Sequence, residues 1–425
     1  MQIGIHNVSD DKLVKEFEEK YRDEIHNYKI DSVDLNEIIN KLGTKKACGI
    51  NKVSNEMIKF GCCGKLLKLI SLIFETIINF NVMPSNFNVG LVKLLVKDNA
   101  KDHNDINNLR PLTISDTLAN IFEKILLKEI NKKYKGKSKQ FGFRNGSSCI
   151  HAVLTLKELI LFNRRKKKKT FVGTIDASKA FDKVNRTRLW VKMINLFEWF
   201  IVRAIKIYYS FSKVIVCVGD ALSSIFNTTI GVKQGGPLSP LLFSIYLDEL
   251  IDWLENVDIG VMFIDTIINC ILFADDILVL ADSEEDLNKL LEIVELYGQQ
   301  NDLKFNHDKT HFIIFGDTLS KTKLESKIKF QGSEIKRVSV IKYLGIFLDE
   351  RLNEKINLTK RKNSYLIGFN KFKRLGIQDV NVSSEVKLFY YKTYIRPLLY
   401  YGIEVMRLSD SQVKKVQTLE SNMIK

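Results

Sequence analysis

The alternation of apolar and polar positions along the chain predicts a series of helices and short strands. A strand-like run ends at Asp176, and two further apolar runs, Ile271–Phe273 and Ile277–Leu280, have the length and spacing of a hairpin. An apolar-periodic pattern that follows Ser239 indicates a helix. The predicted elements are a charged helix over 1–35, a strand over 89–97, helices over 183–211, strands over 213–230, helices over 238–255 and 283–300, and a helical, basic region from about 352.

Because helices alternate with hairpins, the chain is expected to adopt an α+β fold with a mostly antiparallel sheet. Its 425 residues are enough for a sizeable core and for more than one subdomain. Only five prolines occur and no Gly/Ser-rich stretch is present, so the subdomains are expected to pack directly on one another.

Asp275 and Asp276 stand side by side inside the otherwise apolar stretch ILFADDILVL. Two neighbouring carboxylates repel one another, and in a partly desolvated place at least one of them favours its protonated form. One interpretation is a tight turn, because Asp tolerates turn conformations between two strands. The other is a divalent metal site, since a hard cation such as Mg²⁺ binds one or two carboxylates together with substrate phosphates.

A further carboxylate, Asp176, closes a predicted strand well upstream of Asp276. Ligands and catalytic groups are often placed at the ends of strands. If the two strands lie side by side, Asp176 and Asp276 would hold two divalent ions roughly 3.5–4 Å apart, which is polymerase or nuclease chemistry. A helix cap is the alternative for Asp176, and it is the preferred interpretation for Asp182.

The segment GVKQGGPLSPLLF gives a third signal between these carboxylates. Gly235 and Gly236 allow the backbone to approach a ligand closely, and Pro237 stiffens the loop. Gln234 has no apolar or β-branched reason to occupy its position. By itself the segment is more typical of an ordinary strand-to-helix turn capped by Ser239, and only its combination with the carboxylates favours a ligand site.

Composition favours a polyanionic partner. The 65 Lys and Arg exceed the 50 Asp and Glu, which gives a net charge of +15 and fits nucleic acid or an acidic membrane surface. A membrane is the weaker alternative, because even the most apolar window (66–82) contains Lys68 and Glu75. The N-terminus lacks a signal-peptide core, and the cysteines lack zinc-type spacing with histidines. We therefore expect an intracellular protein with reduced thiols, neither secreted nor bound to a membrane.

In this order and spacing, AFDKV, QGGPLSP and FADD resemble the palm motifs of reverse transcriptases, in the branch of the non-LTR (LINE-type) retrotransposons. The resemblance covers nearly the whole chain from about residue 40, and the segment 342–349 is similar to the family's primer grip. The other matching segments are KACGINKVSNEMIK (46–59), LRPLTISDTLANIFEKIL (109–126), QFGFRNGSS (140–148), LKFNHDKT (303–310) and YIRPLLYYGIEVM (394–406).

The resemblance implies a right-hand polymerase fold. An N-terminal charged helical extension (1–35) would precede the fingers (36–169), a palm with the primer grip (170–350) and a helical thumb with the C-terminal region (351–425). The reverse transcriptase domain itself would span about 80–350.

The resemblance also implies the catalytic residues. Asp176, Asp275 and Asp276 would bind two Mg²⁺ ions, with Mn²⁺ as an alternative metal. Lys309 stands where a lysine can donate a proton to the leaving pyrophosphate, although a lysine on a polar turn is more often simply solvated.

Five further residues match nucleotide-binding positions of the family. Arg110 stands where related enzymes grip the triphosphate, a task that suits its planar guanidinium. Gln234 and Gly235 would line the nucleotide pocket. Phe181 would exclude the 2′-hydroxyl of ribonucleotides, with core packing as its alternative role. Arg144 would contact template or triphosphate, with a surface salt bridge as the alternative.

The expected function is RNA-directed DNA synthesis, in which a DNA primer or target 3′-hydroxyl is extended on an RNA template with deoxynucleoside triphosphates. A viral RNA-dependent RNA polymerase is an alternative enzyme, disfavoured by QGGPLSP and Phe181. An inactive or co-opted copy that binds nucleic acid is the non-enzymatic alternative. No endonuclease fits in the first 40 residues, so nicking is expected from another domain or protein, and retrotransposition would require access to the nucleus.

Overall fold

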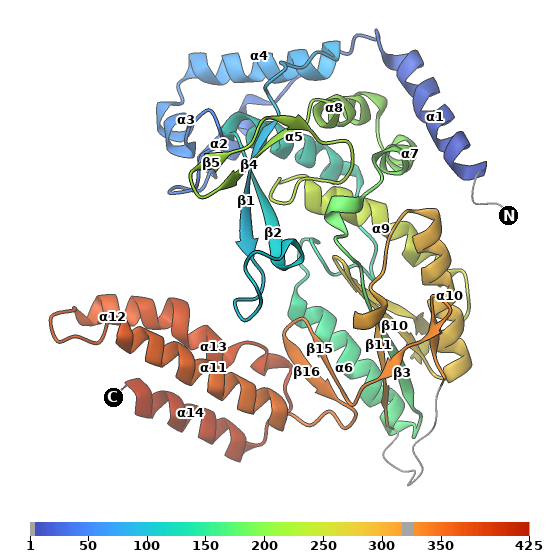
Figure 1. Cartoon of the computed structure of the whole chain (residues 1–425), viewed down its shortest axis with the longest axis vertical. Coiled ribbons are helices and arrows are strands. Elements are labelled where there is room, and N and C mark those ends of the chain that lie inside the picture. The colour runs from blue at the N-terminus through green and yellow to red at the C-terminus, as the bar shows by residue number, and fades with distance from the viewer. Residues whose placement is uncertain (1–4, 317–326, 425) are drawn as a thin grey trace. The chain divides into compact units, whose positions relative to one another are not determined.

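The computed structural model describes residues 5–316 and 327–424. The chain forms two compact units, each assembled from three segments that are separated in the sequence. Unit 1 comprises Met1–Arg144, Ala177–Asn256 and Ile293–Asn306, and unit 2 comprises Asn145–Asp176, Val257–Glu292 and His307–Lys425. Figure 1 labels the helices and strands of both units.

Unit 1 combines helices with a five-stranded sheet. The sheet has the order β2 (Leu109–Ser115), β1 (Val89–Val96), β4 (Lys213–Val218) and β5 (Ala221–Leu222), with β6 (Phe226–Asn227) also paired to β4. Strand β1 runs antiparallel to β2 and parallel to β4. The helices are α1 (Ile5–Tyr21), α2 (Ser32–Asn40), α3 (Asn55–Gly61), α4 (Gly64–Phe80), α5 (Thr117–Lys133), α7 (Arg186–Leu196), α8 (Trp199–Ser210) and α9 (Ser239–Glu255), with 3₁₀ turns η1 (Ile106–Asn108) and η2 (Phe181–Lys183).

Helix α4 illustrates how the sequence builds the core of unit 1. Ile70, Phe74 and Ile77 recur at the spacing of one helical face, and all three are buried. Phe74 packs on Phe122 of α5 with a ring-centroid distance of 5.2 Å. The helix ends at Asn81, whose φ of 54° is a left-handed conformation that Asn tolerates better than most residues.

Unit 2 is built around a second five-stranded sheet. Its order is β14 (Lys336–Arg337), β11 (His311–Phe315), β3 (Thr170–Asp176), β10 (Asp276–Ala281) and β9 (Cys270–Phe273). Strand β3 is antiparallel to both of its neighbours and largely buried. A Cβ atom on Gly173 of β3 would lie 3.0 Å from Val279 and 3.4 Å from Leu287, so helix α10 (Glu284–Gln300) packs closely on the sheet. This helix begins in unit 2 and ends in unit 1.

The remaining elements of unit 2 are short hairpins and helices. The paired strands are β7 (Val261–Phe263) with β8 (Thr266–Ile268), β12 (Lys329–Phe330) with β13 (Ser333–Glu334), and β15 (Val340–Tyr343) with β16 (Ile346–Asp349). The helical elements are α6 (Cys149–Arg165), η3 (His307–Lys309), α11 (Lys355–Arg374), α12 (Ser384–Tyr390), the π turn η4 (Tyr391–Ile395), α13 (Arg396–Tyr400), η5 (Ile403–Val405) and α14 (Asp410–Ile424).

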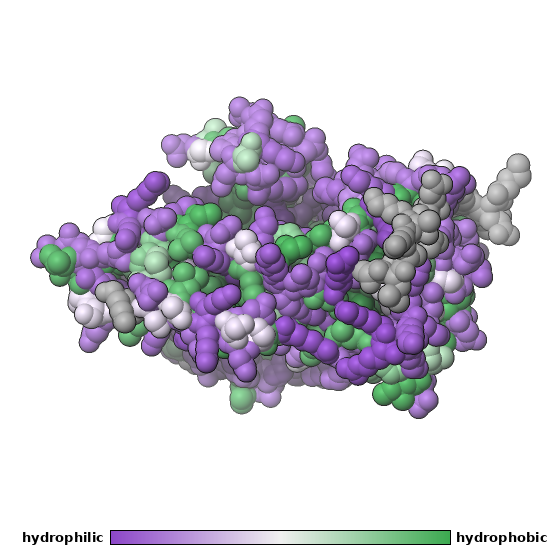
Figure 2. All heavy atoms as spheres, turned by 90° about the horizontal axis from the view of Figure 1, so that it is seen from below, coloured by the Kyte–Doolittle hydropathy of each residue, from purple (hydrophilic) through white to green (hydrophobic). Residues whose placement is uncertain are grey.

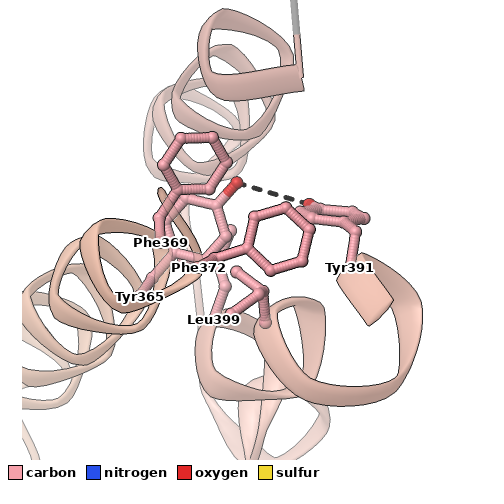
Figure 3. Packing of buried hydrophobic residues seen from close by; sticks show 6 residues of the cluster. Tyr365, Phe369, Phe372, Tyr391 and Leu399 are labelled. Carbon is pink, nitrogen blue, oxygen red and sulfur yellow. Dashed lines mark hydrogen bonds between the residues drawn. The ribbon is translucent and has the colours of Figure 1, made fainter. Parts of the chain in front are cut away.

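The C-terminal helices bury an aromatic cluster of their own. Figure 3 shows this packing, in which the hydroxyls of Tyr365 and Tyr391 lie 3.3 Å apart. Glu420 of α14 accepts a hydrogen bond from Tyr391 at 2.7 Å. These helices therefore enclose a continuous core, whose buried members are Tyr365, Phe369, Phe372, Tyr391, Ile395 and Leu399.

Most predicted elements lie where the sequence placed them, including the strand ending at Asp176, the aspartate hairpin and the helices of 238–255 and 283–300. The single helix predicted over 1–35 is wrong. Helix α1 ends at Tyr21, and α2 begins at Ser32 after Asp31, whose side chain accepts a hydrogen bond from the Val33 N–H. A capping aspartate at this position favours a new helix start over continuation of the first helix.

The predicted limits of fingers, palm and thumb do not coincide with the two compact units, because residues 170–350 contribute to both. The names of these subdomains therefore stay predictions.

The buried carboxylate of Asp248 on α9 makes the stability of the fold depend on pH. Asp248 is 4% exposed, and its Oδ2 accepts hydrogen bonds from the Tyr134 hydroxyl and from the Lys137 backbone N–H at 3.2 Å. Its Oδ1 has no hydrogen-bond partner among the described residues. Burial raises the pKa of Asp248 from 3.8 to about 6; its hydrogen bonds and Lys137 oppose this rise, and the charge of Asp252 adds to it.

Asp248→Asn should remove this pH dependence. Because the folded state binds the Asp248 proton more tightly than the unfolded state, this stabilising contribution is complete below about pH 4 and is lost as the pH rises through about 6. As the pH rises from about 4 to about 7.5, the free energy of unfolding of the variant should increase, relative to that of the wild type, by on the order of 2–3 kcal/mol. Urea denaturation at several pH values measures this difference. Asp220→Asn, at an exposed carboxylate of the same unit, is the control, and parallel pH profiles of Asp248→Asn and wild type would contradict the assignment.

Candidate active site

The three predicted metal carboxylates all lie in unit 2, at one end of the β9–β10 hairpin. Asp276 is the first residue of β10 and pairs directly with Asp176, the last residue of β3. Directly paired residues on antiparallel strands have Cβ atoms about 4.5–5.5 Å apart. Asp275 lies in the two-residue loop next to Ala274, whose φ of 55° matches the first position of the tight turns that join such strands. The predicted adjacency of the two strands is therefore present.

Desolvation and neighbouring negative charges both act on Asp276. The pKa of Asp276 is raised to about 6, first by the loss of surrounding water and then by the negative charges of Asp275 and Asp176. Asp276 therefore keeps its proton to a higher pH than an ordinary aspartate does. A cation among these groups would lower the pKa of Asp276 and favour its ionised form.

The donor chemistry fits a hard divalent cation, because all three side chains offer carboxylate oxygens. In the residues that the structure describes, no group of three or more His, Cys, Asp or Glu side chains is closed around a position where an ion could bind. Asp176, Asp275 and Asp276 therefore supply suitable ligands, but their side chains do not form a preassembled cage.

Lys309 lies beside these carboxylates on η3. Its Nζ is 3.3 Å from Oδ2 of Asp176. The side chains are 66% and 36% exposed respectively, so the pair contributes little to stability. The structure thus places the predicted proton donor next to one of the predicted metal ligands.

The loop with Gln234 and Gly235 lies in unit 1, where it is fixed by backbone and side-chain hydrogen bonds. The Gln234 carbonyl accepts a hydrogen bond from the Thr113 N–H of β2 at 2.7 Å. The Gln234 side-chain amide donates to Oδ1 of Asp182 at 2.7 Å. Asp182 was predicted to cap a helix, and this prediction is wrong: Asn185 caps α7, while Asp182 orients Gln234. Desolvation raises the pKa of Asp182, and the hydrogen bond from Gln234 opposes this rise.

Gly235 and Gly236 are required by close packing around this loop. Gly235 has a φ of 118°, and a Cβ there would lie 2.5 Å from the Thr113 carbonyl oxygen. A Cβ on Gly236 would lie 2.8 Å from Oε2 of Glu123. Ser239 is the first residue of α9 and does not cap it, because the N-cap position belongs to Leu238.

Phe181 serves the packing of unit 1 and also keeps a partly accessible ring. It stacks on the buried Phe243 with a centroid distance of 4.6 Å and meets Phe143 edge to face at 6.1 Å. Its carbonyl accepts a hydrogen bond from the Val232 N–H at 2.8 Å, which ties η2 to the segment that leads into Gln234. Phe181 could therefore pack in the core and also exclude the 2′-hydroxyl of a ribonucleotide.

The two predicted phosphate-binding arginines are both in unit 1 and both exposed. Arg110 lies on β2 opposite Leu95 of β1. Arg144 donates from Nη1 to the carbonyls of Lys137 and Ser138, at 3.3 and 3.1 Å. Both roles predicted for Arg144, the contact with template or triphosphate and the surface salt bridge, stay predictions.

The profile of one protein family matches most of this arrangement. The family described as reverse transcriptase (RNA-dependent DNA polymerase) matches residues 97–348, which include β3, β10 and the Gln234 loop. The chain belongs to the reverse transcriptase family.

Curated relatives place it in the non-LTR retrotransposon branch of that family. It is 25% identical over 408 residues to an RNA-directed DNA polymerase from mobile element jockey of Drosophila funebris. The matched residues cover 92% of this chain and 43% of the relative. It is 29% identical over 253 residues to a retrovirus-related Pol polyprotein from type-2 retrotransposable element R2DM of Drosophila melanogaster, which covers 56% of this chain and 23% of the relative. The chain spans less than half the length of these relatives. The predicted family is confirmed.

A solved structure of telomerase from Candida tropicalis with a fragment of telomeric RNA is similar with a TM-score of 0.46 and 12% identity, over 80% of this chain and 55% of that one. The family match and the mixture of helices with antiparallel strands confirm the predicted α+β polymerase fold.

Sequence reasoning missed the buried polar network beneath the Gln234 loop of this reverse transcriptase. Lys233 is 6% exposed; its ammonium donates to Asn88 and lies 3.2 Å from the Tyr208 hydroxyl. Tyr208 donates to Glu123 at 2.6 Å, and Glu123 accepts from the Leu238 N–H at 3.0 Å. Burial lowers the pKa of Lys233 to about 8. The available signal was a lysine that follows the apolar Val232 and stands two residues before Gly235.

Gly235→Ala should destabilise unit 1 more than Gly136→Ala. Both glycines have positive φ, but a Cβ at Gly136 meets nothing within 4 Å. Each variant incurs backbone strain, and Gly235→Ala also forces the loop away from Thr113, which should cost about 1–3 kcal/mol more. Urea denaturation of both variants measures the difference. Equal losses would mean that the loop accommodates a side chain.

Proposed function

We propose that this chain is an RNA-directed DNA polymerase that extends a DNA 3′-hydroxyl on an RNA template. The observation that carries the proposal is the direct pairing of Asp176 with Asp276 across β3 and β10, with Asp275 in the adjoining turn. Paired carboxylates of this kind suit nucleotidyl transfer, in which negative charge develops on phosphate oxygens.

Asp176, Asp275 and Asp276 would hold two Mg²⁺ ions, for which Mn²⁺ could substitute. When bound, these ions would supply activation of the attacking hydroxyl and neutralisation of the triphosphate. Lys309, 3.3 Å from Asp176, would hold a proton close to the leaving pyrophosphate.

The residues of unit 1 would bind and orient the incoming deoxynucleoside triphosphate. Arg110 would offer a planar fork to the phosphates, and Gln234 and Gly235, in the loop packed against Thr113, would line the nucleotide pocket. Phe181 would exclude the ribose 2′-hydroxyl while Asp182 keeps Gln234 in one orientation. Arg144 would contact template or triphosphate.

An RNA template and a DNA primer or target are the proposed macromolecular partners. Figure 2 shows that hydrophilic residues cover much of the face it displays. Helix α11 is strongly basic, which suits salt-dependent contact with a nucleic-acid backbone. Its cationic residues are Lys355, Lys360, Arg361, Lys362, Lys371, Lys373 and Arg374.

Residues 36–169 would form the fingers, 170–350 the palm and 351–425 the thumb. A nicking endonuclease would be supplied by another domain or protein. Activity as a mobile element would also require access to the nucleus.

None of the helices between residues 5 and 316 or 327 and 424 has the length and apolar character that crossing a bilayer requires.

Asp275→Ala should abolish DNA synthesis, whereas Asp265→Ala should not. Asp265 occupies the same place as Asp275 in the two-residue turn of another unit 2 hairpin, β7–β8, and also follows a residue with positive φ, Ile264 at 57°. Primer extension on an RNA template with deoxynucleotides and Mg²⁺ should fall on the order of a hundredfold or more in Asp275→Ala and stay near wild type in Asp265→Ala.

Other outcomes of this experiment distinguish the alternatives. A wild-type protein that binds RNA in a salt-dependent manner but makes no product would support a binding role for an inactive copy. Preference for ribonucleotides over deoxynucleotides would support an RNA polymerase.

Phe181→Ala should weaken discrimination against ribonucleotides. Removing the ring opens space near the sugar, so the ratio of deoxy- to ribonucleotide incorporation should fall roughly ten- to a hundredfold. Single-nucleotide incorporation kinetics measure this ratio, and Phe226→Ala, at an exposed aromatic of the same unit, is the control. A lower stability with an unchanged ratio would assign Phe181 to core packing alone.

A further inference from the structure

An unbroken run of cationic residues joins helix α6 to strand β3 in unit 2. The residues of this run are Arg164, Arg165, Lys166, Lys167, Lys168 and Lys169. All of them except Lys169 are exposed. A run of this kind is usually disordered, because like charges repel one another. Here the run is folded into one tight turn, and we call residues 164–169 the basic turn.

The basic turn ends α6 with a complete Schellman motif. The Lys168 N–H donates to the Asn163 carbonyl at 2.9 Å. The Lys167 N–H donates to the Arg164 carbonyl at 3.1 Å. These two bonds satisfy carbonyl groups that the end of a helix otherwise leaves without a partner. They also require a left-handed residue at Lys167, whose φ is 57°.

Lysine is an unusual residue at this position. The left-handed conformation favours glycine, because a Cβ atom crowds the following carbonyl group. Helix α11 ends with the corresponding bond, from the Gly376 N–H to the Lys373 carbonyl at 2.9 Å, and its left-handed residue is a glycine with a φ of 71°. The basic turn therefore keeps a cation at a position where glycine would be more stable.

A buried side chain fixes the basic turn from inside the protein. Asn163 is 1% exposed, and its Nδ2 donates to Oγ1 of Thr170 at 3.0 Å and to Oδ1 of Asp282 at 2.7 Å. Thr170 is the first residue of β3, so this amide connects the end of the helix to the start of the strand. The cations are thus held in place before any partner arrives, which reduces the entropy lost on binding.

Little of the charge of the basic turn is compensated. The ammonium of Lys168 lies 3.4 Å from Oδ2 of Asp282. In the part of the chain that the structure describes, Arg165, Lys166 and Lys167 form no ion pair with a carboxylate. Three adjacent exposed cations therefore remain available to an anionic partner.

The acidic first turn of α10 follows Asp282 in the sequence and makes contacts of its own. Oε1 of Glu284 accepts a hydrogen bond from the Lys327 N–H at 2.7 Å. Asp286 lies 3.7 Å from the ammonium of Lys289 in the same helix. Neither contact involves the basic turn.

The basic turn and the candidate metal carboxylates lie at opposite ends of β3. This strand runs from Thr170 to Asp176, and a strand rises about 3.3 Å per residue, so roughly 20 Å separate its two ends. A partner of the basic turn therefore contacts the protein outside the carboxylate centre. Cations in the last turn of a helix also stabilise the helix dipole, but this effect fades beyond that turn, whereas the run continues to the start of β3.

We propose that the basic turn binds the phosphate backbone of a nucleic-acid strand at a site separate from the carboxylate centre. Adjacent cations on one fixed turn match a polymer whose negative charges repeat along its length. A protein groove that reads an extended basic peptide fits less well, because the turn would have to give up the Schellman bonds. Binding is measured without DNA synthesis, so this inference is tested independently of the proposed polymerase function.

Two variants of the full chain test the proposal. The triple variant Arg165→Gln/Lys166→Gln/Lys167→Gly removes three exposed cations from the basic turn. Lys167→Gly alone removes one cation and relieves the strain of the left-handed lysine, so it should raise the urea midpoint while it weakens binding. The matched control removes the same charge from exposed lysines of α1, in the variant K12Q/K15Q/K20Q.

Fluorescence anisotropy with a single-stranded oligouridylate and with a duplex DNA oligonucleotide measures the effect at several salt concentrations. Loss of three phosphate contacts should make the slope of log K against log salt shallower by about 2–3. Near physiological ionic strength, the triple variant should bind roughly ten- to a hundredfold more weakly than the wild type, and Lys167→Gly roughly three- to fivefold. The control should retain the wild-type slope and bind within about threefold of the wild type.

The two nucleic acids identify the strand. A loss restricted to the oligouridylate would assign the basic turn to RNA, and a loss restricted to the duplex would assign it to DNA; either supports the proposal. Equal affinities and slopes for the triple variant and the control would overturn it. A lower urea midpoint of Lys167→Gly with unchanged binding would assign the cations to the stability of α6 instead.

Two further partners are tested with the same variants. Unchanged nucleic-acid binding with weaker binding to phosphatidylserine vesicles would overturn the proposal in favour of an acidic membrane surface. Unchanged nucleic-acid binding with lost binding to a purified nuclear import receptor would overturn it in favour of a targeting peptide. A wild type that makes no DNA would contradict the proposed function and leave these binding results unaffected.

Discussion

The direct pairing of Asp176 with Asp276 across β3 and β10 is the constraint on which the candidate site of unit 2 depends. Burial, followed by the negative charges of Asp275 and Asp176, raises the pKa of Asp276, so these carboxylates are held together at a cost. A fold that keeps them there must fix the register of β3 against β10, because a slip by one residue would turn one carboxylate to the opposite face of the sheet. The buried strand β3 and the close approach of α10 at Gly173 provide that fixation.

A different kind of constraint organises unit 1, where the backbone itself forms the site. The Gln234 loop approaches β2 so closely that Gly235 has no room for a side chain, and the Thr113–Gln234 hydrogen bond fixes the distance. Lys233, Tyr208 and Glu123 support the same loop from inside the protein. Such a network adds little net stability per bond, but each member left unpaired would be costly. The network therefore specifies one loop conformation, as the proposed binding of a triphosphate would require.

The sequence was sufficient to predict a feature where residue chemistry and hydrophobic periodicity agree. The prediction failed where the feature depends on a contact between distant segments. Asp275 and Asp276 interrupt an apolar hairpin, so their position was evident from local pattern alone. Asp182 was misassigned because an Asp near a helix start is usually a cap, whereas here its partner is Gln234, 52 residues away. The break after Tyr21 was missed because charged residues continue through it.

These failures share a physical cause that also bears on function. Helix and strand formation depend on neighbours within a few residues, but the exact placement of a carboxylate or a loop depends on single hydrogen bonds between segments far apart in the chain. The pairing of Asp276 with Asp176 and the bond from Gln234 to Asp182 are both of this second kind. Polymerase chemistry depends on geometry held to within fractions of an ångström. The contacts least visible in the sequence are therefore the ones on which the proposed reaction should depend most.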